Sequence, residues 1–327
     1  MSFSRSGAVS RRRLLQAAVA ACAAPAALAQ SDFPTRTVTI VVPFPPGGPT
    51  DASARLYAKA MSQSLGASIV IDNRAGAAGT VGSAAVARGP ADGYTLLWGG
   101  TSTLAVAPGL YKNLKYEAQS FQPIGMALRG PLMIAAHPGA GISSMADLVQ
   151  KAKTKNLTVG TAGSGSIGHL ATELLAETAN IKLTHVPYRG GGPALNDALG
   201  GQIDLIFDNA SALYPHIKAG KLRGIAVGGA QPYAPAPEIP TVHAALKADY
   251  EAYSWFGLVA PNATPEPVLR KLRTAFADAV QSAEVRHELA EMGLEAGNAD
   301  ARVFGQVIAA DYRKWSGIIA RANVQAD

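Results

Sequence analysis

Residues 41–51 read VVPFPPGGPTD, and this stretch sets the local fold at the start of the chain. An apolar run that predicts a strand enters a turn rich in Gly and Pro, and a helix follows. Backbone N–H groups at a helix N-terminus are free donors with partial positive charge, so anionic groups bind there without a lysine. The stretch therefore predicts an anion-binding turn between a strand and a helix.

Three further glycine-rich turns repeat this pattern. Each leads into a helix, and glycine lets the backbone approach a ligand closely. Taken alone, any one of these turns indicates tight packing between strand and helix more often than binding. Together they favour one cleft that holds an anion. The four turns are Pro45–Thr50, Ala75–Gly82, Gly160–Gly168 and Arg189–Pro193.

Short β-branched runs alternate with helical stretches after residue 36. This alternation predicts an α/β fold with mostly parallel sheets. The expected strands are Thr37–Phe44, Ser68–Asp72, Thr95–Trp98, Leu132–Ala136, Thr158–Thr161, Leu183–Pro187, Asp204–Phe207, Gly224–Val227 and Phe256–Val259. The expected helices are Thr50–Leu65, Thr80–Arg88, Ser144–Lys153, Ile167–Thr178, Pro193–Leu199, Ser211–Ala219, Pro265–Gln281, Ala283–Met292 and Ala299–Arg321.

The length of the chain suits two lobes of ordinary domain size. Two weakly patterned segments, Ala118–Arg129 and Gly228–Pro240, are expected to carry the chain between them. The first lobe is then expected to hold residues 31–126 plus 228–327, and the second lobe residues 127–227.

The composition allows a large core, since 48% of the 327 residues are apolar and 16% are charged. The formal charge of +6 depends on the first 29 residues, which hold four arginines and no acid. Without them, 25 of the 29 Lys and Arg residues remain against 23 acids, a net charge of +2. Such a chain lacks the basic surface of a nucleic-acid-binding protein, so we expect no nucleic-acid partner.

Residues 1–29 are typical of an export signal. A basic segment, Arg11–Arg13, precedes the apolar stretch Leu14–Ala24, which is too short to stay in a bilayer as a spanning helix. Ala27–Ala29 provides a cleavage site. Ser10–Leu15 fits a twin-arginine signal as well as the general secretory route, and lipid attachment at Cys22 is a minority alternative. Cleavage after Ala29 leaves no cysteine, and therefore no disulfide or zinc–thiolate site.

Residues 163–168 read GSGSIG and match the G-x-G-x-x-G fingerprint of dinucleotide-binding folds. They follow an expected strand and open an expected helix. The next strand ends in Val186–Arg189, VPYR, without the acid that holds a ribose hydroxyl, and Ser166 stands where a P-loop requires lysine. A dinucleotide-dependent oxidoreductase is therefore an alternative that the sequence disfavours.

Signatures of catalysis are sparse. The chain has no G-x-S-x-G motif, and its six histidines are dispersed without metal-ligand spacing. We expect no catalytic residue, no metal and no cofactor, with an exported hydrolase as a further alternative. Asp51 either caps a helix or faces a ligand. Asp208 ends an apolar strand, where open α/β sheets bind ligands, and either accepts a hydrogen bond from a ligand amine or hydroxyl or fixes a loop.

Aromatic residues divide into two groups by their place along the strands. Phe44 and Tyr188 lie beside glycine turns and are expected in the pocket, whereas Trp98 and Trp255 lie within strands and are expected in the core. His169, at the start of a helix behind a glycine turn, has a ligand role and a packing role as equal alternatives.

Several long motifs, in a fixed order from Phe33 to Arg321, resemble the solute-binding proteins of tripartite tricarboxylate transporters, the Bug proteins. These motifs are VPFPPGGPTD at 42–51, NRAGAAGTVG at 73–82, PADGYTLL at 90–97, GTAGSGS at 160–166, VPYRG at 186–190, LGGQID at 199–204 and WFGLVAP at 255–261.

The resemblance implies a two-lobed periplasmic binding protein of type II that closes about a hinge. It implies a monomer that captures a small carboxylate and delivers it to an integral-membrane permease; a sensor without a permease is an alternative. In the family, the first strand-to-helix turn and a glycine turn of the second lobe hold the carboxylate. The ligand-binding residues implied here are Phe44, Gly48, Thr50, Asp51, Ser102, Thr161, Gly163, Ser164, Ser166, Tyr188, Arg189 and Asp208.

Overall fold

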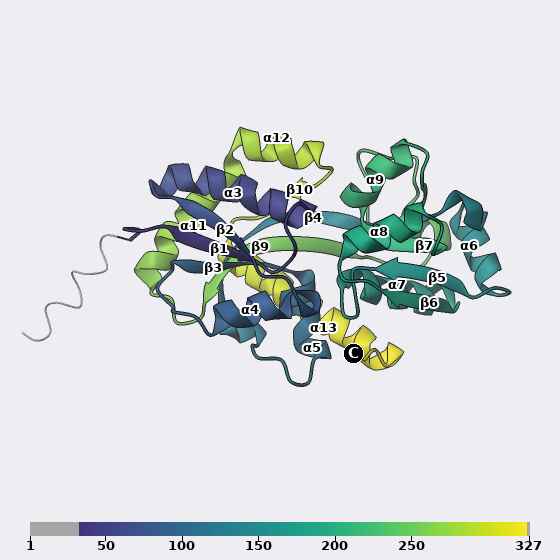
Figure 1. The fold of residues 1–327 in the computed structure, drawn as a ribbon, viewed down its shortest axis with the longest axis horizontal. Helices are drawn as coiled ribbons and strands as arrows, with labels where there is room; N and C mark the ends of the chain where they lie inside the picture. Colours follow the sequence, from purple (N-terminus) through teal and green to yellow (C-terminus); the bar gives the residue numbers. More distant parts are fainter. Residues whose placement is uncertain (1–32, 326–327) are drawn as a thin grey trace, which may run out of the picture.

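The computed structural model describes residues 33–325, which form two halves built on one curled α/β sheet (Figure 1). The export signal expected at residues 1–29, with Cys22 and the cleavage site at Ala29, lies outside the described residues. The strands are β1 (Val38–Val42), β2 (Ile69–Asn73), β3 (Thr95–Gly100), β4 (Phe121–Ala136), β5 (Leu157–Thr161), β6 (Leu183–Pro187), β7 (Leu205–Asn209), β8 (Arg223–Val227), β9 (Tyr253–Pro261) and β10 (Glu295–Ala296).

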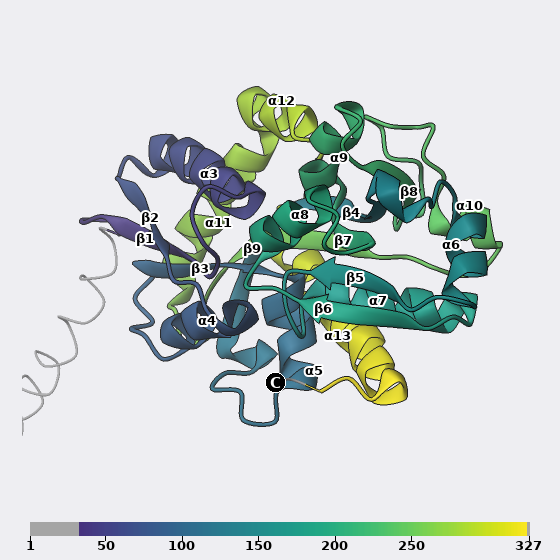
Figure 2. The ribbon, with the colours of Figure 1, turned by 45° about the vertical axis from the view of Figure 1, so that its right-hand side comes forward.

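Helices cover both faces of the sheet in each half, as Figures 1 and 2 show. The α-helices are α3 (Pro49–Leu65), α4 (Thr80–Ala87), α5 (Ala107–Leu110), α6 (Met145–Ala152), α7 (Ile167–Ala179), α8 (Gly191–Leu199), α9 (Ala210–Lys218), α10 (Val242–Leu246), α11 (Glu266–Gln281), α12 (Ala283–Glu291) and α13 (Ala301–Ala322). Short helical turns are η1 (Ala77–Gly79), η2 (Thr101–Val106), η3 (Ala118–Ser120) and η4 (Pro138–Ala140).

The strand order is β2-β1-β3-β9-β4-β7-β5-β6, with β8 and β10 also paired to β4. β1 runs parallel to β2 and β3 in the first half, and β5 runs parallel to β6 and β7 in the second, as the alternating pattern predicts. The central strands β4 and β9 run antiparallel to their neighbours. The carboxyl ends of β1, β5 and β7 lead into three of the glycine or acidic turns, so binding residues gather along the junction of the halves.

Strand β4 contains the predicted strand Leu132–Ala136 and extends it back through most of Ala118–Arg129, the segment whose sequence is weakly patterned. The strand begins at Phe121, and its first part pairs with β9 while Leu132–Ala136 pairs with β7 and β8. The register of the pairing with β9 shifts between Pro123 and Gly125, so an irregular pairing accommodates the proline within the strand. β4 thus carries the chain from one half to the other.

The predicted lobe limits, residues 31–126 plus 228–327 and residues 127–227, stay a prediction. The chain after β8 folds back on the second half: Tyr233 and Ile239 belong to the same buried cluster as Met133 and Ile206. It then enters β9 and returns to the first half.

The core of the first half lies between its sheet and the helices α3 and α11. Tyr57 of α3 stacks on Phe276 of α11 with ring centroids 5.4 Å apart, and Trp98 of β3 lies 5.3 Å from Tyr57. Trp98 and Trp255 are both buried, as predicted. These contacts fix α3, and thereby the turn that precedes it, against the sheet.

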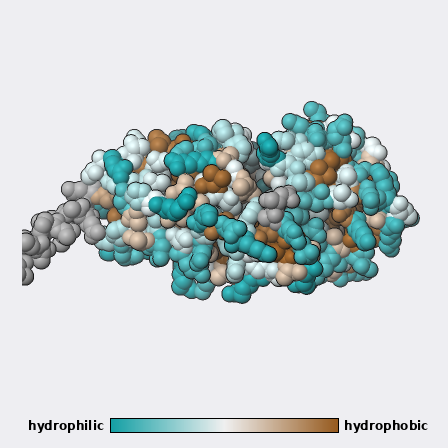
Figure 3. Space-filling view, turned by 60° about the horizontal axis from the view of Figure 1, so that its bottom comes forward, coloured by the Kyte–Doolittle hydropathy of each residue, from teal (hydrophilic) through white to brown (hydrophobic). Residues whose placement is uncertain are grey.

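The surface of the described residues is mixed in polarity. On the face shown in Figure 3, hydrophobic residues are scattered among hydrophilic ones. Within residues 33–325, no helix is both long and apolar enough to span a membrane.

Candidate functional site

Residues from all four glycine turns line one cavity of about 440 Å³ at the junction of the two halves. The first half contributes the turn before α3, Ala78 and the aromatic ring of Phe256. The second half contributes the N-terminal ends of α7 and α8 and the turn after β7. The turns, widely spaced in sequence, therefore face the same space.

The turn between β1 and α3 presents backbone donors to this cavity. Gly48 is the N-cap of α3 and Pro49 follows it, and no side chain caps the helix. The first N–H groups of a helix have no intrahelical acceptor. Gly47 adopts φ +87°, a conformation that favours glycine. An anion at this helix end would be held by neutral donors.

Asp51 is buried behind this turn and does not line the cavity. Its carboxylate accepts hydrogen bonds from Gly47 N (3.0 Å), Arg55 Nε (2.9 Å) and Asn73 Nδ2 (3.0 Å). Burial acts to raise the pKa of Asp51, but these hydrogen bonds outweigh it and the pKa is lowered. The ionised Asp51 therefore stabilises the folded state. This contribution to the free energy of unfolding is complete above the ordinary aspartate pKa and is lost as pH falls through the lowered pKa of Asp51.

Asn73, at the end of β2, is a positioning residue that the sequence analysis did not single out. Its Nδ2 donates to the carbonyl of Phe44 (3.1 Å) as well as to Asp51. Asn73 thus ties the turn before α3 to the start of the glycine turn Ala75–Gly82. The only feature of the sequence that pointed to it was its place in the NRAGAAGTVG motif.

The turn between β5 and α7 owes its shape to glycine. Gly163 and Gly165 have φ of +128° and +74°, and a Cβ on Gly168 would overlap the carbonyl oxygen of Phe207. Backbone conformation thus explains the first two glycines of the G-x-G-x-x-G match, and close packing explains the third. Ser166 caps α7: its Oγ accepts a hydrogen bond from His169 N at 3.3 Å.

His169 lies behind this turn and does not line the cavity, which favours the packing alternative. Its ring stacks on His185 with centroids 3.7 Å apart, and its Nδ1 accepts a hydrogen bond from Gly165 N at 3.2 Å. Thr161 hydrogen-bonds His185 at 2.6 Å and is fully buried. The stacked histidines therefore pack against the turn between β5 and α7.

Two hydrogen bonds join one half to the other. Ser102, in the η2 turn that follows β3, lines the cavity and accepts a hydrogen bond from Ile167 N of α7 at 3.1 Å. Tyr111 donates its hydroxyl to Ser164 O at 3.3 Å. The N-terminus of α7 is thus held against the first half.

The far end of the cavity holds charged residues at the turns after β6 and β7. Asp208 and Arg189 both line it. Burial raises the pKa of Asp208, and hydrogen bonds from Asn209 offset only part of this effect. Tyr188 points elsewhere, since its hydroxyl donates to Asp197 at 2.8 Å.

The structure separates the predicted binding residues into two groups. Those that line the cavity are Phe44, Gly48, Thr50, Ser102, Ser166, Arg189 and Asp208, and those that do not are Asp51, Thr161, Gly163, Ser164 and Tyr188. Among the lining residues that the sequence analysis missed are Ser53, Ser211, Ser254, Phe256 and Leu294. Only Phe256 belongs to a quoted motif.

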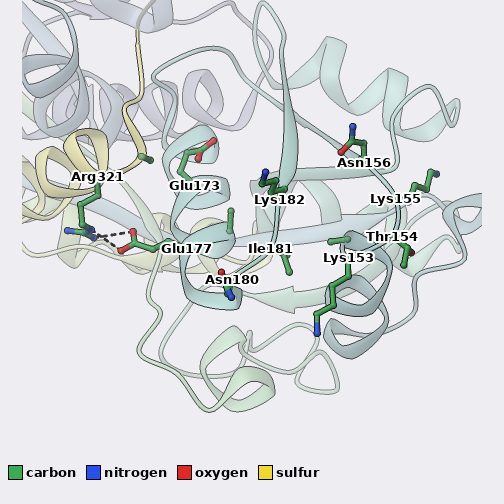
Figure 4. A pocket seen from close by; sticks show the side chains of 13 residues that line it. Lys153, Thr154, Lys155, Asn156, Glu173, Glu177, Asn180, Ile181, Lys182 and Arg321 are labelled. Atoms are coloured by element: carbon green, nitrogen blue, oxygen red, sulfur yellow. Dashed lines mark hydrogen bonds and ion pairs between the residues drawn. The ribbon is translucent and has the colours of Figure 1, made fainter.

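A second cavity, of about 940 Å³, lies between α7 and the end of α13 (Figure 4). Its charged residues are exposed apart from Glu173, which is partly buried, and Arg321 forms an ion pair with Glu177 at 2.8 Å. No glycine turn reaches it. Among residues 33–325, no group of three His, Cys, Asp or Glu side chains is placed to hold a metal ion.

The chain matches the sequence profile described as "Tripartite tricarboxylate transporter family receptor" over residues 53–324. Protein BugT of Bordetella pertussis (strain Tohama I) is 33% identical over 306 residues, 92% of this chain and 93% of BugT. A structure of an R. palustris protein with adipate is 35% identical in sequence. It superposes with a TM-score of 0.85, covering 90% of this chain and 99% of that one. MatC from Rhodopseudomonas palustris with bound malate is 32% identical, with a TM-score of 0.82 over 88% of this chain and 100% of MatC.

Proposed function

The chain belongs to the family of tripartite tricarboxylate transporter receptors, and we propose that it captures a small carboxylate in the periplasm and delivers it to an integral-membrane permease. Candidate ligands are di- and tricarboxylates, acidic amino acids and aromatic acids. The convergence of four glycine turns on one cavity carries the proposal. The related structures with adipate and malate support the ligand class.

The proposed contacts follow from the cavity lining. The carboxylate lies between the N-terminal ends of α3 and α7, near Gly48, Thr50, Ser102 and Ser166. Phe44 and Phe256, with ring centroids 6.3 Å apart at 89°, form an apolar wall. Asp51, Thr161, Gly163, Ser164 and Tyr188 then act by positioning the turns rather than by touching the ligand.

A ligand held by both halves would stabilise the closed state through its differential affinity for that state. Ser102 and Tyr111 already join the halves around the cavity. The permease would recognise the closed surface, and the ligand would leave when these contacts open.

The protein acts without catalytic residues or a cofactor, as a monomer, after cleavage of the export signal near Ala29. The scattered hydrophobic residues of the surface in Figure 3 support a monomer.

Thermal-shift screening followed by calorimetry tests the proposal. The mature chain, from residue 30, is titrated with succinate, adipate, malate, citrate, aspartate, glutamate and nicotinate. At least one acid is expected to raise the melting temperature by several degrees, because ligand binding to the folded state stabilises it by mass action. NADH serves as the control for the dinucleotide alternative. Stabilisation by NADH and by none of the acids would refute the carboxylate assignment.

Replacing Asp51 by alanine is expected to weaken carboxylate binding about tenfold, whereas the melting temperature falls by only a few degrees. The change leaves Gly47 N and Asn73 Nδ2 without their acceptor, which costs about 1–3 kcal/mol, and it releases the turn before α3. Calorimetry and thermal unfolding measure the two effects. Asp72→Ala, which removes an exposed ion pair with Arg74, is the matched control. A large fall in melting temperature with unchanged affinity would assign Asp51 a packing role.

A further inference from the structure

One oxygen of Asp208 has no hydrogen-bond partner among residues 33–325. Its Oδ1 accepts two hydrogen bonds, from Asn209 N at 2.7 Å and from Asn209 Nδ2 at 3.1 Å. Its Oδ2 accepts none, although the residue lines the cavity. The two oxygens of this carboxylate therefore differ: one is satisfied by the protein and the other is open to a ligand.

Residues at the starts of α8 and α9 surround the Oδ2 end of the cavity. Gly191, the first residue of α8, lies against it, and a Cβ there would overlap Oδ2. Ser211, in the first turn of α9, also lines the cavity, and its buried hydroxyl has no hydrogen-bond partner within the described part of the chain. A buried polar atom without a hydrogen bond is unfavourable, so this end of the cavity is incomplete without a polar ligand group.

We propose that the ligand carries a hydrogen-bond donor, a hydroxyl or an ammonium group, in addition to its carboxylate, and that Asp208 Oδ2 accepts from it. This inference rests on the proposed function, because it assumes that a carboxylate occupies the turns of α3 and α7. It divides the candidate acids into two groups: hydroxy and amino acids fit the cavity better than plain acids of the same length.

The chemistry of Asp208 determines the direction of this preference. A carboxylate oxygen without a proton only accepts, so it favours a donor and repels a second carboxylate. The opposite arrangement, in which a protonated Asp208 donates to a plain dicarboxylate, predicts equal or tighter binding of the plain acid. A matched ligand series separates the two.

The test compares acids that differ only in the donor: malate and aspartate against succinate, glutamate against glutarate, and mandelate against phenylacetate. Calorimetry is expected to show roughly ten- to hundredfold tighter binding of a donor-bearing acid than of its plain analogue, the range for a hydrogen bond to a charged group. The malate and aspartate results distinguish a hydroxyl from an ammonium donor.

Asp208→Asn should abolish this preference. Asn209 presents two donors where Oδ1 lies, so the amide oxygen of the new side chain takes that place and its NH₂ group faces the cavity. A donor then meets a donor, and the ratio of affinities within each pair should fall to about twofold or less. Asp249→Asn removes the same charge at an exposed position outside the cavity and should leave the ratio unchanged.

The outcomes distinguish this inference from the proposed function. Equal binding of plain and donor-bearing acids by the unmodified protein would overturn the inference and leave carboxylate capture intact, and this comparison needs no variant. An unchanged ratio in Asp208→Asn would also overturn it. Failure of every acid to bind would refute both.

Discussion

Ser166→Pro is expected to weaken carboxylate binding by at least about thirtyfold, with a much smaller effect on the melting temperature. Ser166 has φ −71°, which proline adopts without strain. The change nevertheless removes the N–H that donates to Gly163 O (3.0 Å) and the hydroxyl that caps α7. Proline also disfavours the left-handed conformation that Gly165 has before it.

The affinity should fall because the donors at the start of α7 no longer point at one position. Each hydrogen bond to a charged group contributes about 1.5–3 kcal/mol, and 1.4 kcal/mol corresponds to a tenfold change in affinity. Calorimetry with the tightest acid of the panel measures this loss. Ser166→Thr keeps a capping hydroxyl and is the control. If Ser166→Pro bound the acid as tightly as the unmodified protein, the α7 turn would not be part of the site.

Phe276→Ala is expected to show the opposite profile, with a loss of about 3–5 kcal/mol in the free energy of unfolding and nearly unchanged affinity. The ring is fully buried, stacks on Tyr57 and packs so closely on β4 that a Cβ on Gly125 would overlap it. Alanine leaves a cavity that a rigid sheet and two helices do not fill. The residue does not line the binding cavity.

Chemical denaturation measures this loss, and the melting temperature should fall by roughly 10 °C. Phe276→Leu refills most of the space and should cost clearly less. Affinity measured well below the transition should stay within about twofold of the unmodified protein. A tenfold loss of affinity in Phe276→Ala would mean that the core between α3 and α11 controls the geometry of the site.

Local pattern was enough to place most elements of the fold. The predicted strand Leu183–Pro187 has the limits that the structure shows for β6, and α3 begins one residue before the predicted Thr50. Apolar periodicity and turn residues are properties of neighbouring residues, so they can be read without the rest of the chain. Only the last part of strand β4, Leu132–Ala136, was predicted, because the prolines and glycines in its first part weaken the local strand pattern, which pairing with β9 overrides.

For the binding residues too, the sequence predicted the local backbone but not the contacts between distant segments. The turns were predicted from glycine and proline, but the direction of each side chain depends on partners far along the chain. Asp51 turns away from the cavity toward Asn73, and Thr161 turns toward His185. Ser211 and Ser254 reach the cavity only because the start of α9 and the start of β9 lie beside it, and no local pattern distinguishes these serines from others.

What the sequence by itself determined was the family, the strand–helix order and the turns that leave helix N-termini open, because backbone conformation at glycine and proline is a local property. Only the tertiary structure decided that these turns meet. The pairing of β4 with β7 and β9, and the hydrogen bond from Ile167 N to Ser102, bring the two halves together. These contacts join residues tens of positions apart, and their geometry follows from the packing of the whole chain.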